Sequence, residues 1–142
     1  MNENFSMGFN ANLAPDAFLK WSKHYLKCES DFKSPDSFSP IPYFLLGRSI
    51  ELSLKSIYLK SQKQSKVRNT YGHDLLKAFR NLPPNVLILE NPEITLLEDA
   101  SNIYKGKGFE YYDPEDILTG FSRYPDLNKL RLLAKKIISA IS

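Results

Sequence analysis

Three charged side chains lie inside the most apolar stretch of the sequence, Phe44–Lys60. Arg48, Glu51 and Lys55 are spaced i, i+3 and i+7, so they share one face of the helix that this stretch predicts. Charged groups in a buried helix need partners. The nearby His73-Asp74 pair can supply them, and we expect Glu51 to accept a hydrogen bond from the ring of His73.

This polar group allows two interpretations. In the first, the three charges form a pocket with Tyr71, His73, Asp74 and Arg123 that holds a phosphate or a base. Arginine suits such a pocket because its planar fork matches the oxygens of a phosphate. In the second, the charges form an internal ion-pair network that fixes helix packing, or a row that faces the solvent.

Length and composition restrict the class of protein. The 142 residues predict one domain over 14–142, after a flexible tail at 1–13. A single cysteine excludes an internal disulfide, and two histidines far apart in the chain favour no metal site, so we expect no metal and no cofactor. We find no secretory signal and no apolar run long enough to span a membrane, so we expect a cytoplasmic protein without a membrane partner.

Charge is unevenly distributed along the chain, although the formal net charge is only +3. The segment Lys55–Arg80 holds seven basic residues and one acid, whereas Glu90–Asp116 holds eight acids and two lysines. Such asymmetry indicates a polyanion-binding face. It also fits an ordinary solvated surface, or two complementary surfaces that meet within a monomer or across a dimer.

Apolar periodicity predicts an all-α protein in which five helices position these side chains. No segment offers a convincing strand, because Val86–Leu89 has no partner to pair with and is expected to be a packed connector. Ser61–Arg68 is polar and predicts an exposed linker, and Asp113–Asp116 can open one helical turn. The predicted helices span about 14–31, 42–62, 73–81, 92–105 and 126–141.

Three motifs occur in an order that resembles HEPN domains. They are the central helix Leu46-Gly-Arg-Ser-Ile-Glu-Leu-Ser-Leu-Lys-Ser56, then Tyr71-Gly-His-Asp-Leu-Leu76, and finally Arg123-Tyr-Pro-Asp126. More narrowly, the chain is similar to HEPN-like proteins whose third helix opens with Gly-His-Asp-Leu, over roughly residues 15–140. The resemblance implies a HEPN-like bundle of four to five helices, with an up-and-down core and a short third helix. It also implies a homodimer and a role near RNA or nucleotides.

Catalytic HEPN proteins carry an arginine and a histidine separated by four to six residues. Arg68-Asn-Thr-Tyr-Gly-His73 has this spacing. In such a pair the neutral imidazole takes a proton from a 2′-hydroxyl, and the arginine stabilises the phosphate as charge develops on it. The resemblance thus implies Arg68 and His73 as catalytic residues of a metal-independent ribonuclease.

Three functional hypotheses follow. In catalytic HEPN proteins the motif usually lies on the last long helix, whereas here it lies in the linker and at the start of the third helix. The first hypothesis is therefore a non-catalytic HEPN-like module that binds RNA, a nucleotide or a nucleotidyltransferase-type partner, in a toxin–antitoxin or defence context. The second is a metal-independent endoribonuclease, and the third is a pure protein-interaction or dimerisation domain.

Overall fold

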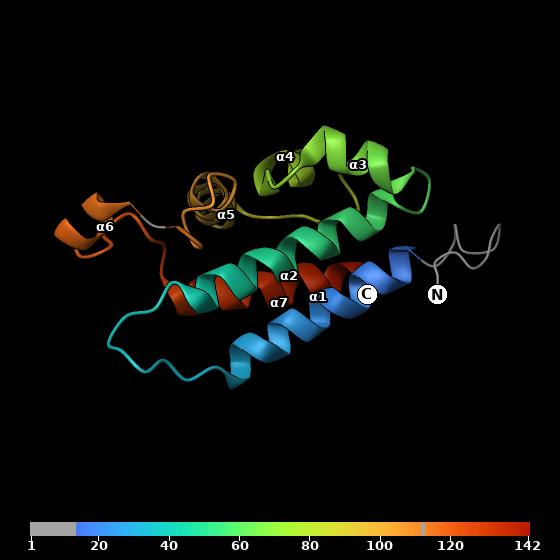
Figure 1. The fold of residues 1–142 in the computed structure, drawn as a ribbon. Coiled ribbons are helices and arrows are strands. Elements are labelled where there is room, and N and C mark those ends of the chain that lie inside the picture. The colour runs from blue at the N-terminus through green and yellow to red at the C-terminus, as the bar shows by residue number, and fades with distance from the viewer. Residues whose placement is uncertain (1–13, 112) are drawn as a thin grey trace.

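The structure, a computed structural model, describes residues 14–111 and 113–142 (Figure 1). Its described residues form helices and contain no strand, which confirms the all-α prediction. The tail predicted at 1–13 lies outside the described residues. The helices are α1 (Ala14–Asp31), α2 (Ile41–Tyr58), α3 (Gln64–Tyr71), α4 (Leu75–Arg80), α5 (Asn91–Tyr104), α6 (Pro114–Leu118) and α7 (Leu127–Ile141).

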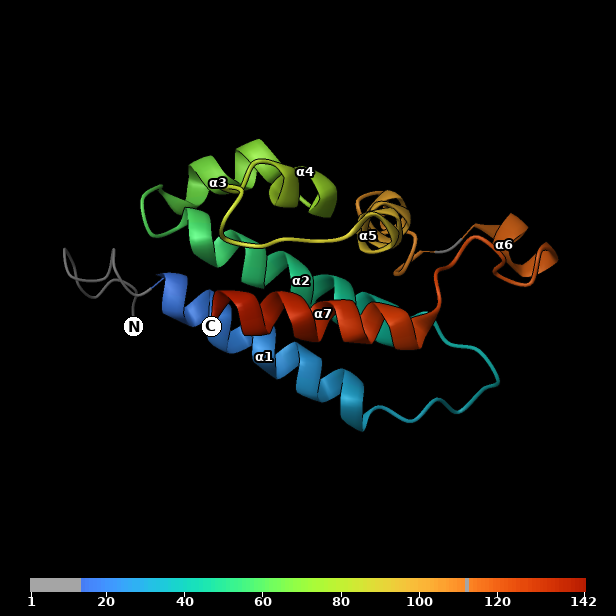
Figure 2. The ribbon, with the colours of Figure 1, turned by 180° about the vertical axis from the view of Figure 1, so that it is seen from behind.

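The helix α2 is the centre of the fold, as its nearly continuous apolar surface predicts. The side chains of Leu46, Ile50 and Leu54 are completely buried. In Figures 1 and 2, α1 and α7 lie along one side of α2, α3 and α4 cover the other side, and α5 crosses close to α2. None of the described helices has the length and apolarity needed to cross a membrane.

The directions of the core helices differ from a simple up-and-down bundle. The chain reverses between α1 and α2, but α7 runs in the same direction as α2 (Figures 1 and 2). The hydroxyl of Tyr43, near the start of α2, accordingly donates to the carbonyl of Pro125, just before α7, at 2.8 Å. The segment through α6 connects the end of α5 with the start of α7.

Helix α3 lies where we predicted an exposed linker, and that prediction is wrong. Its outer positions are polar, but Val67 and Tyr71 are buried at a spacing of one helical turn. The ring of Tyr71 stacks on that of Tyr58 from α2, with centroids 4.4 Å apart. Two apolar residues are enough to anchor a helix of two turns, although they are too few to produce a clear periodic pattern.

Two close approaches bring α1 and α5 against α2. Ser22 and Ser49 exchange hydrogen bonds, each hydroxyl donating to the other residue's carbonyl, at 2.6 and 2.8 Å. At Gly47 an added Cβ would lie only 2.5 Å from the ring of Tyr104. The absence of a side chain at Gly47 therefore lets the Tyr104 ring reach the polar face of α2.

Candidate functional site

The carboxylate of Glu51 is the centre of a buried polar cluster. Its side chain is 5% exposed, and it accepts hydrogen bonds from three residues. The ring nitrogen Nδ1 of His73 lies 3.0 Å from Oε1, and Nζ of Lys55 lies 2.7 Å from Oε2. The Tyr104 hydroxyl also donates to Oε1. The predicted contact between Glu51 and His73 is thereby confirmed.

These contacts determine the ionisation of Glu51. Burial alone would raise the pKa of this carboxyl, but the hydrogen bonds and charge of Lys55, with the donors Tyr104 and His73, outweigh it and lower the pKa. Burial and the charge of Glu51 raise the pKa of Tyr104, so its hydroxyl keeps the proton it donates. An ionised carboxylate only accepts hydrogen bonds, so Nδ1 of His73 carries a proton. In the neutral form of the ring, Nε2 is then the nitrogen without a proton.

Arg48 extends the cluster towards α1. Its Nη1 lies 3.9 Å from Oε1 of Glu51, and its side chain is 30% exposed. The guanidinium also lies 5.4 Å from the ring centroid of Tyr25, within the range of a cation–π contact. The α1 helix thus supports the guanidinium from one side while Glu51 attracts it from the other.

A cavity of about 270 Å³ opens beside this cluster, and we call it the α2–α3 cavity. Arg48, Glu51 and Lys55 line it from α2, and Arg68 and His73 line it from α3 and the turn that follows. The structure therefore brings the predicted polar triplet and the predicted Arg-His pair to one site. Among the described residues, the side chain of Arg68 has no ion-pair partner.

Two of the predicted pocket residues support the neighbouring helices instead of lining the cavity. Tyr71 is buried against Tyr58, as described above. Asp74 is the N-cap of α4, where its carboxylate accepts hydrogen bonds from the backbone N–H of Lys77 at 3.1 Å and from the Ser101 hydroxyl at 3.2 Å. An N-cap satisfies a backbone donor that the helix leaves free, so Asp74 stabilises the start of α4.

Arg123 is the third predicted pocket residue that does not line the cavity, and it lies at a different part of the fold. Its guanidinium donates two hydrogen bonds to the buried carboxylate of Asp116 on α6, at 2.7 and 2.9 Å. This bidentate contact lowers the pKa of Asp116. The pair holds the α6 excursion in place and does not contribute to the α2–α3 cavity.

Sequence analysis did not identify Tyr104 as part of the cluster. The ring reaches Glu51 because α5 crosses α2 at Gly47, one helical turn before Glu51. The glycine within an otherwise bulky apolar helix was the available signal, since it marks a close approach by another element. Phe18 and Gln64, which also line the cavity, carried no comparable signal.

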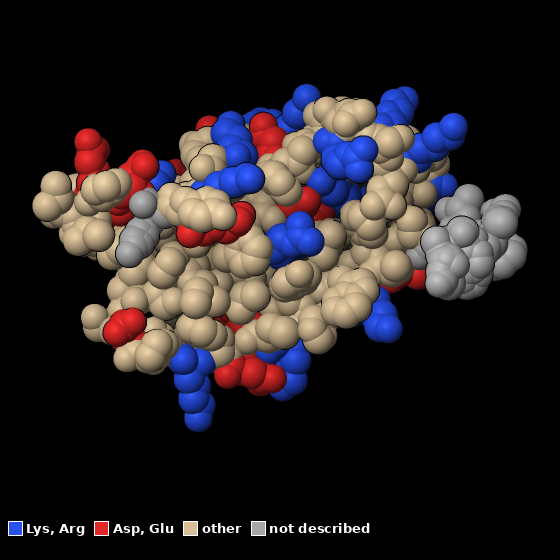
Figure 3. Space-filling view, in the orientation of Figure 1, with Lys and Arg blue, Asp and Glu red and all other residues tan. Residues whose placement is uncertain are grey.

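The cations over α3 and α4 are grouped on one part of the surface. Elsewhere, some basic side chains pair with acids, as Arg131 does with Glu29 at 2.6 Å and Lys136 with Glu93 at 2.7 Å. Others in the described chain, such as Lys20, Lys33 and Lys135, have no ion-pair partner but are scattered along the sequence. Figure 3 shows Lys and Arg side chains gathered over α3 and α4. Within the described chain, six of these cations have no ion-pair partner, and we call them the basic surface: Lys60, Lys63, Lys66, Arg68, Lys77 and Arg80.

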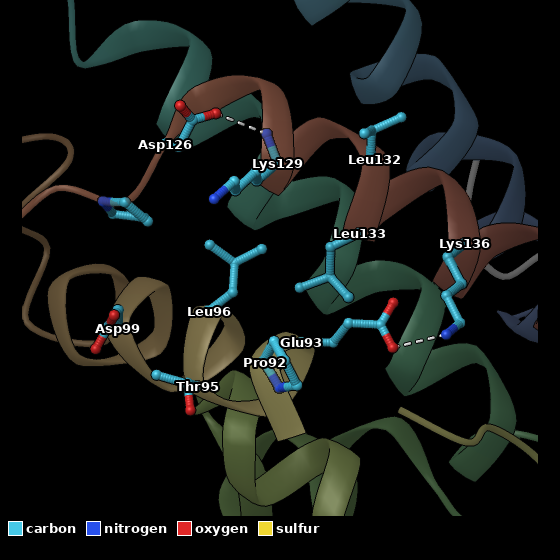
Figure 4. A pocket seen from close by; sticks show the side chains of 11 residues that line it. Pro92, Glu93, Thr95, Leu96, Asp99, Asp126, Lys129, Leu132, Leu133 and Lys136 are labelled. Carbon is cyan, nitrogen blue, oxygen red and sulfur yellow. Dashed lines mark hydrogen bonds and ion pairs between the residues drawn. The ribbon is translucent and has the colours of Figure 1, made fainter. Parts of the chain in front are cut away.

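A larger hollow of about 610 Å³ lies between α5 and α7, and we call it the α5–α7 groove (Figure 4). Leu96, Leu132 and Leu133 supply apolar lining, and Leu132 is 64% exposed. Glu93 and Lys136 pair with each other across one end of the groove, as Figure 4 shows. None of the residues predicted for the functional site lies in this groove.

The described residues contain no group of three or more His, Cys, Asp or Glu side chains arranged to hold a metal ion. Comparisons of the chain with family models, with curated proteins and with solved structures found no match. The chemical groups of the α2–α3 cavity and the cations around it are therefore the basis for a functional proposal.

Proposed function

We propose that the protein is a HEPN-like module that binds RNA through the α2–α3 cavity and the basic surface, without cleaving it. The observation that carries this proposal is the group of six cations without acidic partners between Lys60 and Arg80, one of which, Arg68, lines the α2–α3 cavity. The acidic segment Glu90–Asp116 does not neutralise the basic surface. Glu93 pairs with Lys136, and Asp116 pairs with Arg123. The one ion pair between this segment and Lys55–Arg80 in the described chain joins Lys105 to Asp74 at 3.9 Å and involves no residue of the basic surface.

The cavity offers phosphate groups a positioned set of donors. Glu51 holds Lys55 and attracts Arg48, so both side chains are ordered before a ligand arrives. Arg68 at the rim retains its full bonding capacity, and an arginine can donate two parallel hydrogen bonds to a phosphate. Binding by such contacts is dominated by the phosphate backbone and weakens steeply as salt is added.

The test is fluorescence anisotropy of a labelled mixed-sequence single-stranded RNA as salt rises from about 50 mM to about 200 mM. We expect affinity to fall steeply with salt. We also expect Arg68→Gln to weaken binding about tenfold, which is the loss of one charge-assisted contact. The matched control is Lys135→Gln, an exposed lysine of α7 outside the basic surface. Absent binding, or equal losses in both variants, would overturn the proposal.

One observation favours a second candidate function, a metal-independent endoribonuclease. Arg68 and His73 line the same cavity, and Glu51 binds Nδ1 of His73. A carboxylate in this position fixes the ring tautomer and leaves Nε2 as the base that can accept a proton from a 2′-hydroxyl. RNA cleavage that persists in EDTA and is lost in both Arg68→Ala and His73→Ala would support this function. Intact RNA bound to the folded wild type would exclude it.

We also propose that the α5–α7 groove joins two copies of the chain in a homodimer. A two-fold interface places the same patch on both partners, so any charged residues in the patch must be able to meet charges of the opposite sign. The groove satisfies this condition, because Asp99 and Asp126 lie beside Lys129 and Lys136 around an exposed leucine, Leu132.

A further inference from the structure

The only tryptophan of the chain lies in an exposed position on α1, the helix that contributes Phe18 to the α2–α3 cavity. Trp21 is 49% exposed. Phe18, Trp21 and Tyr25 are spaced i, i+3 and i+7, so they follow one face of the helix. Phe18 lines the cavity. The ring of Tyr25 makes a cation–π contact with the guanidinium of Arg48, and Arg48 also lines the cavity. Trp21 is therefore placed between two residues that connect α1 with the cavity.

The contacts of Trp21 leave much of its indole in the solvent. Its ring meets the ring of His24 at 4.8 Å between centroids and at an interplanar angle of 76°. The two rings are thus in edge contact and do not stack in parallel. A single exposed apolar side chain is common on protein surfaces. What distinguishes Trp21 is its place on the helix face between Phe18, which lines the cavity, and Tyr25, which contacts Arg48.

Cations together with exposed aromatic rings are the combination used to bind single-stranded nucleic acid. The cations contact the phosphates, and the rings stack on unpaired bases. We infer that Trp21 stacks on a base of single-stranded RNA whose neighbouring phosphate lies in the α2–α3 cavity. This inference rests on the proposed function and narrows its ligand to an unpaired strand, since a duplex keeps its bases stacked inside.

Arg48 links the two parts of this site. It is held over Tyr25 on one side and lies 3.9 Å from Glu51 on the other, so its position is set by both α1 and α2. A phosphate bound at Arg48 would lie on the side of the cavity nearest α1. The next base along the strand would then be close to the exposed indole.

Intrinsic fluorescence tests the inference directly, because all tryptophan emission comes from Trp21. The wild type is titrated with a single-stranded RNA, with a duplex of the same sequence and with inorganic polyphosphate, and binding is followed in parallel by anisotropy with a labelled competitor RNA. We expect the single strand to quench the emission in step with binding. Polyphosphate should displace the labelled RNA without quenching the emission.

Substitution separates stacking from charge. We expect Trp21→Ala to weaken single-stranded RNA binding about tenfold or more, the effect of losing one stacked base, and to leave polyphosphate binding unchanged. Trp21→Phe should retain most of the affinity, and Ile88→Ala, at another exposed apolar residue, should retain all of it. Because Trp21 is half exposed, its variants are expected to fold, which circular dichroism checks.

The possible outcomes are distinguishable. If single-stranded RNA binds without quenching and Trp21→Ala binds like the wild type, the stacking inference is wrong while RNA binding stands. If the duplex binds as tightly as the single strand and quenches equally, the restriction to unpaired strands is wrong. If none of the three polyanions binds, the proposed function itself fails, and the inference fails with it.

Discussion

The hydroxyl of Tyr104 on α5 donates a hydrogen bond to Glu51 on α2, so the crossing of two helices is fixed by a buried tyrosine–carboxylate pair. The same carboxylate accepts from Lys55 and His73. One side chain thus connects the core packing of α5 with the chemistry of the cavity. The predictions below separate these two contributions.

Replacing Glu51 should destabilise the protein strongly. Glu51→Gln keeps the shape of the side chain but leaves Lys55, whose side chain is only 7% exposed, without its counter-charge. Breaking one partner of a buried ion pair costs about 3–5 kcal/mol. Urea unfolding measures the loss, and the exposed Glu98→Gln serves as the control, for which we expect no more than about 0.5 kcal/mol. Similar midpoints for the two variants would contradict the prediction.

The contribution of Glu51 should depend on pH in a defined direction. Its pKa in the folded protein is lowered from the ordinary value of 4.5, so the stabilisation is complete above that value and is lost as the pH falls through the folded pKa. We therefore expect the difference in unfolding free energy between wild type and Glu51→Gln to be constant near neutral pH and to shrink below 4.5. A difference that grows on acidification would show that the sign is wrong.

The close approach at Gly47 gives a prediction that runs against helix propensity. In an ordinary helix interior, Gly→Ala stabilises by about 1 kcal/mol. Here the new Cβ would lie 2.5 Å from the Tyr104 ring, so we expect Gly47→Ala to destabilise by about 1–3 kcal/mol. Thermal unfolding in the Tyr104→Ala background provides the test. There the clash is absent, and the same substitution should become neutral or stabilising.

The proposed homodimer depends on the exposed leucine of the α5–α7 groove. We expect the wild type to elute as a dimer in size-exclusion chromatography with light scattering. Leu132→Glu should shift it to the monomer, because a carboxylate would be buried in an apolar contact. The control is Ile88→Glu, which changes a residue that is 72% exposed and does not line the groove. A monomeric wild type, or a dimer unaffected by Leu132→Glu, argues against this interface.

The sequence allowed the helices with strong apolar periodicity to be predicted to within a few residues, because burial of one face determines where such helices begin and end. It also allowed the contact between Glu51 and His73 to be predicted, since a buried carboxylate requires donors. Helix α3 was missed because only Val67 and Tyr71 anchor it.

Other features depend on tertiary geometry that no local pattern encodes. The contact of Tyr104 with Glu51 is determined by the angle at which α5 crosses α2. The side chain of Arg123 was expected at the pocket, but the buried carboxylate of Asp116, only seven residues away in the chain, binds it more directly. Local pairs of this kind form whenever the intervening loop folds back on itself.

The double function of Glu51 has a consequence for how the protein can vary. The carboxylate that orders Lys55 and His73 at the cavity also holds α5 against α2. A substitution at Glu51 would therefore change ligand recognition and folding together, so neither property can drift independently of the other. By contrast, the side chains of Trp21 and Arg68 are exposed, which leaves them free to tune the choice of ligand while the scaffold stays intact.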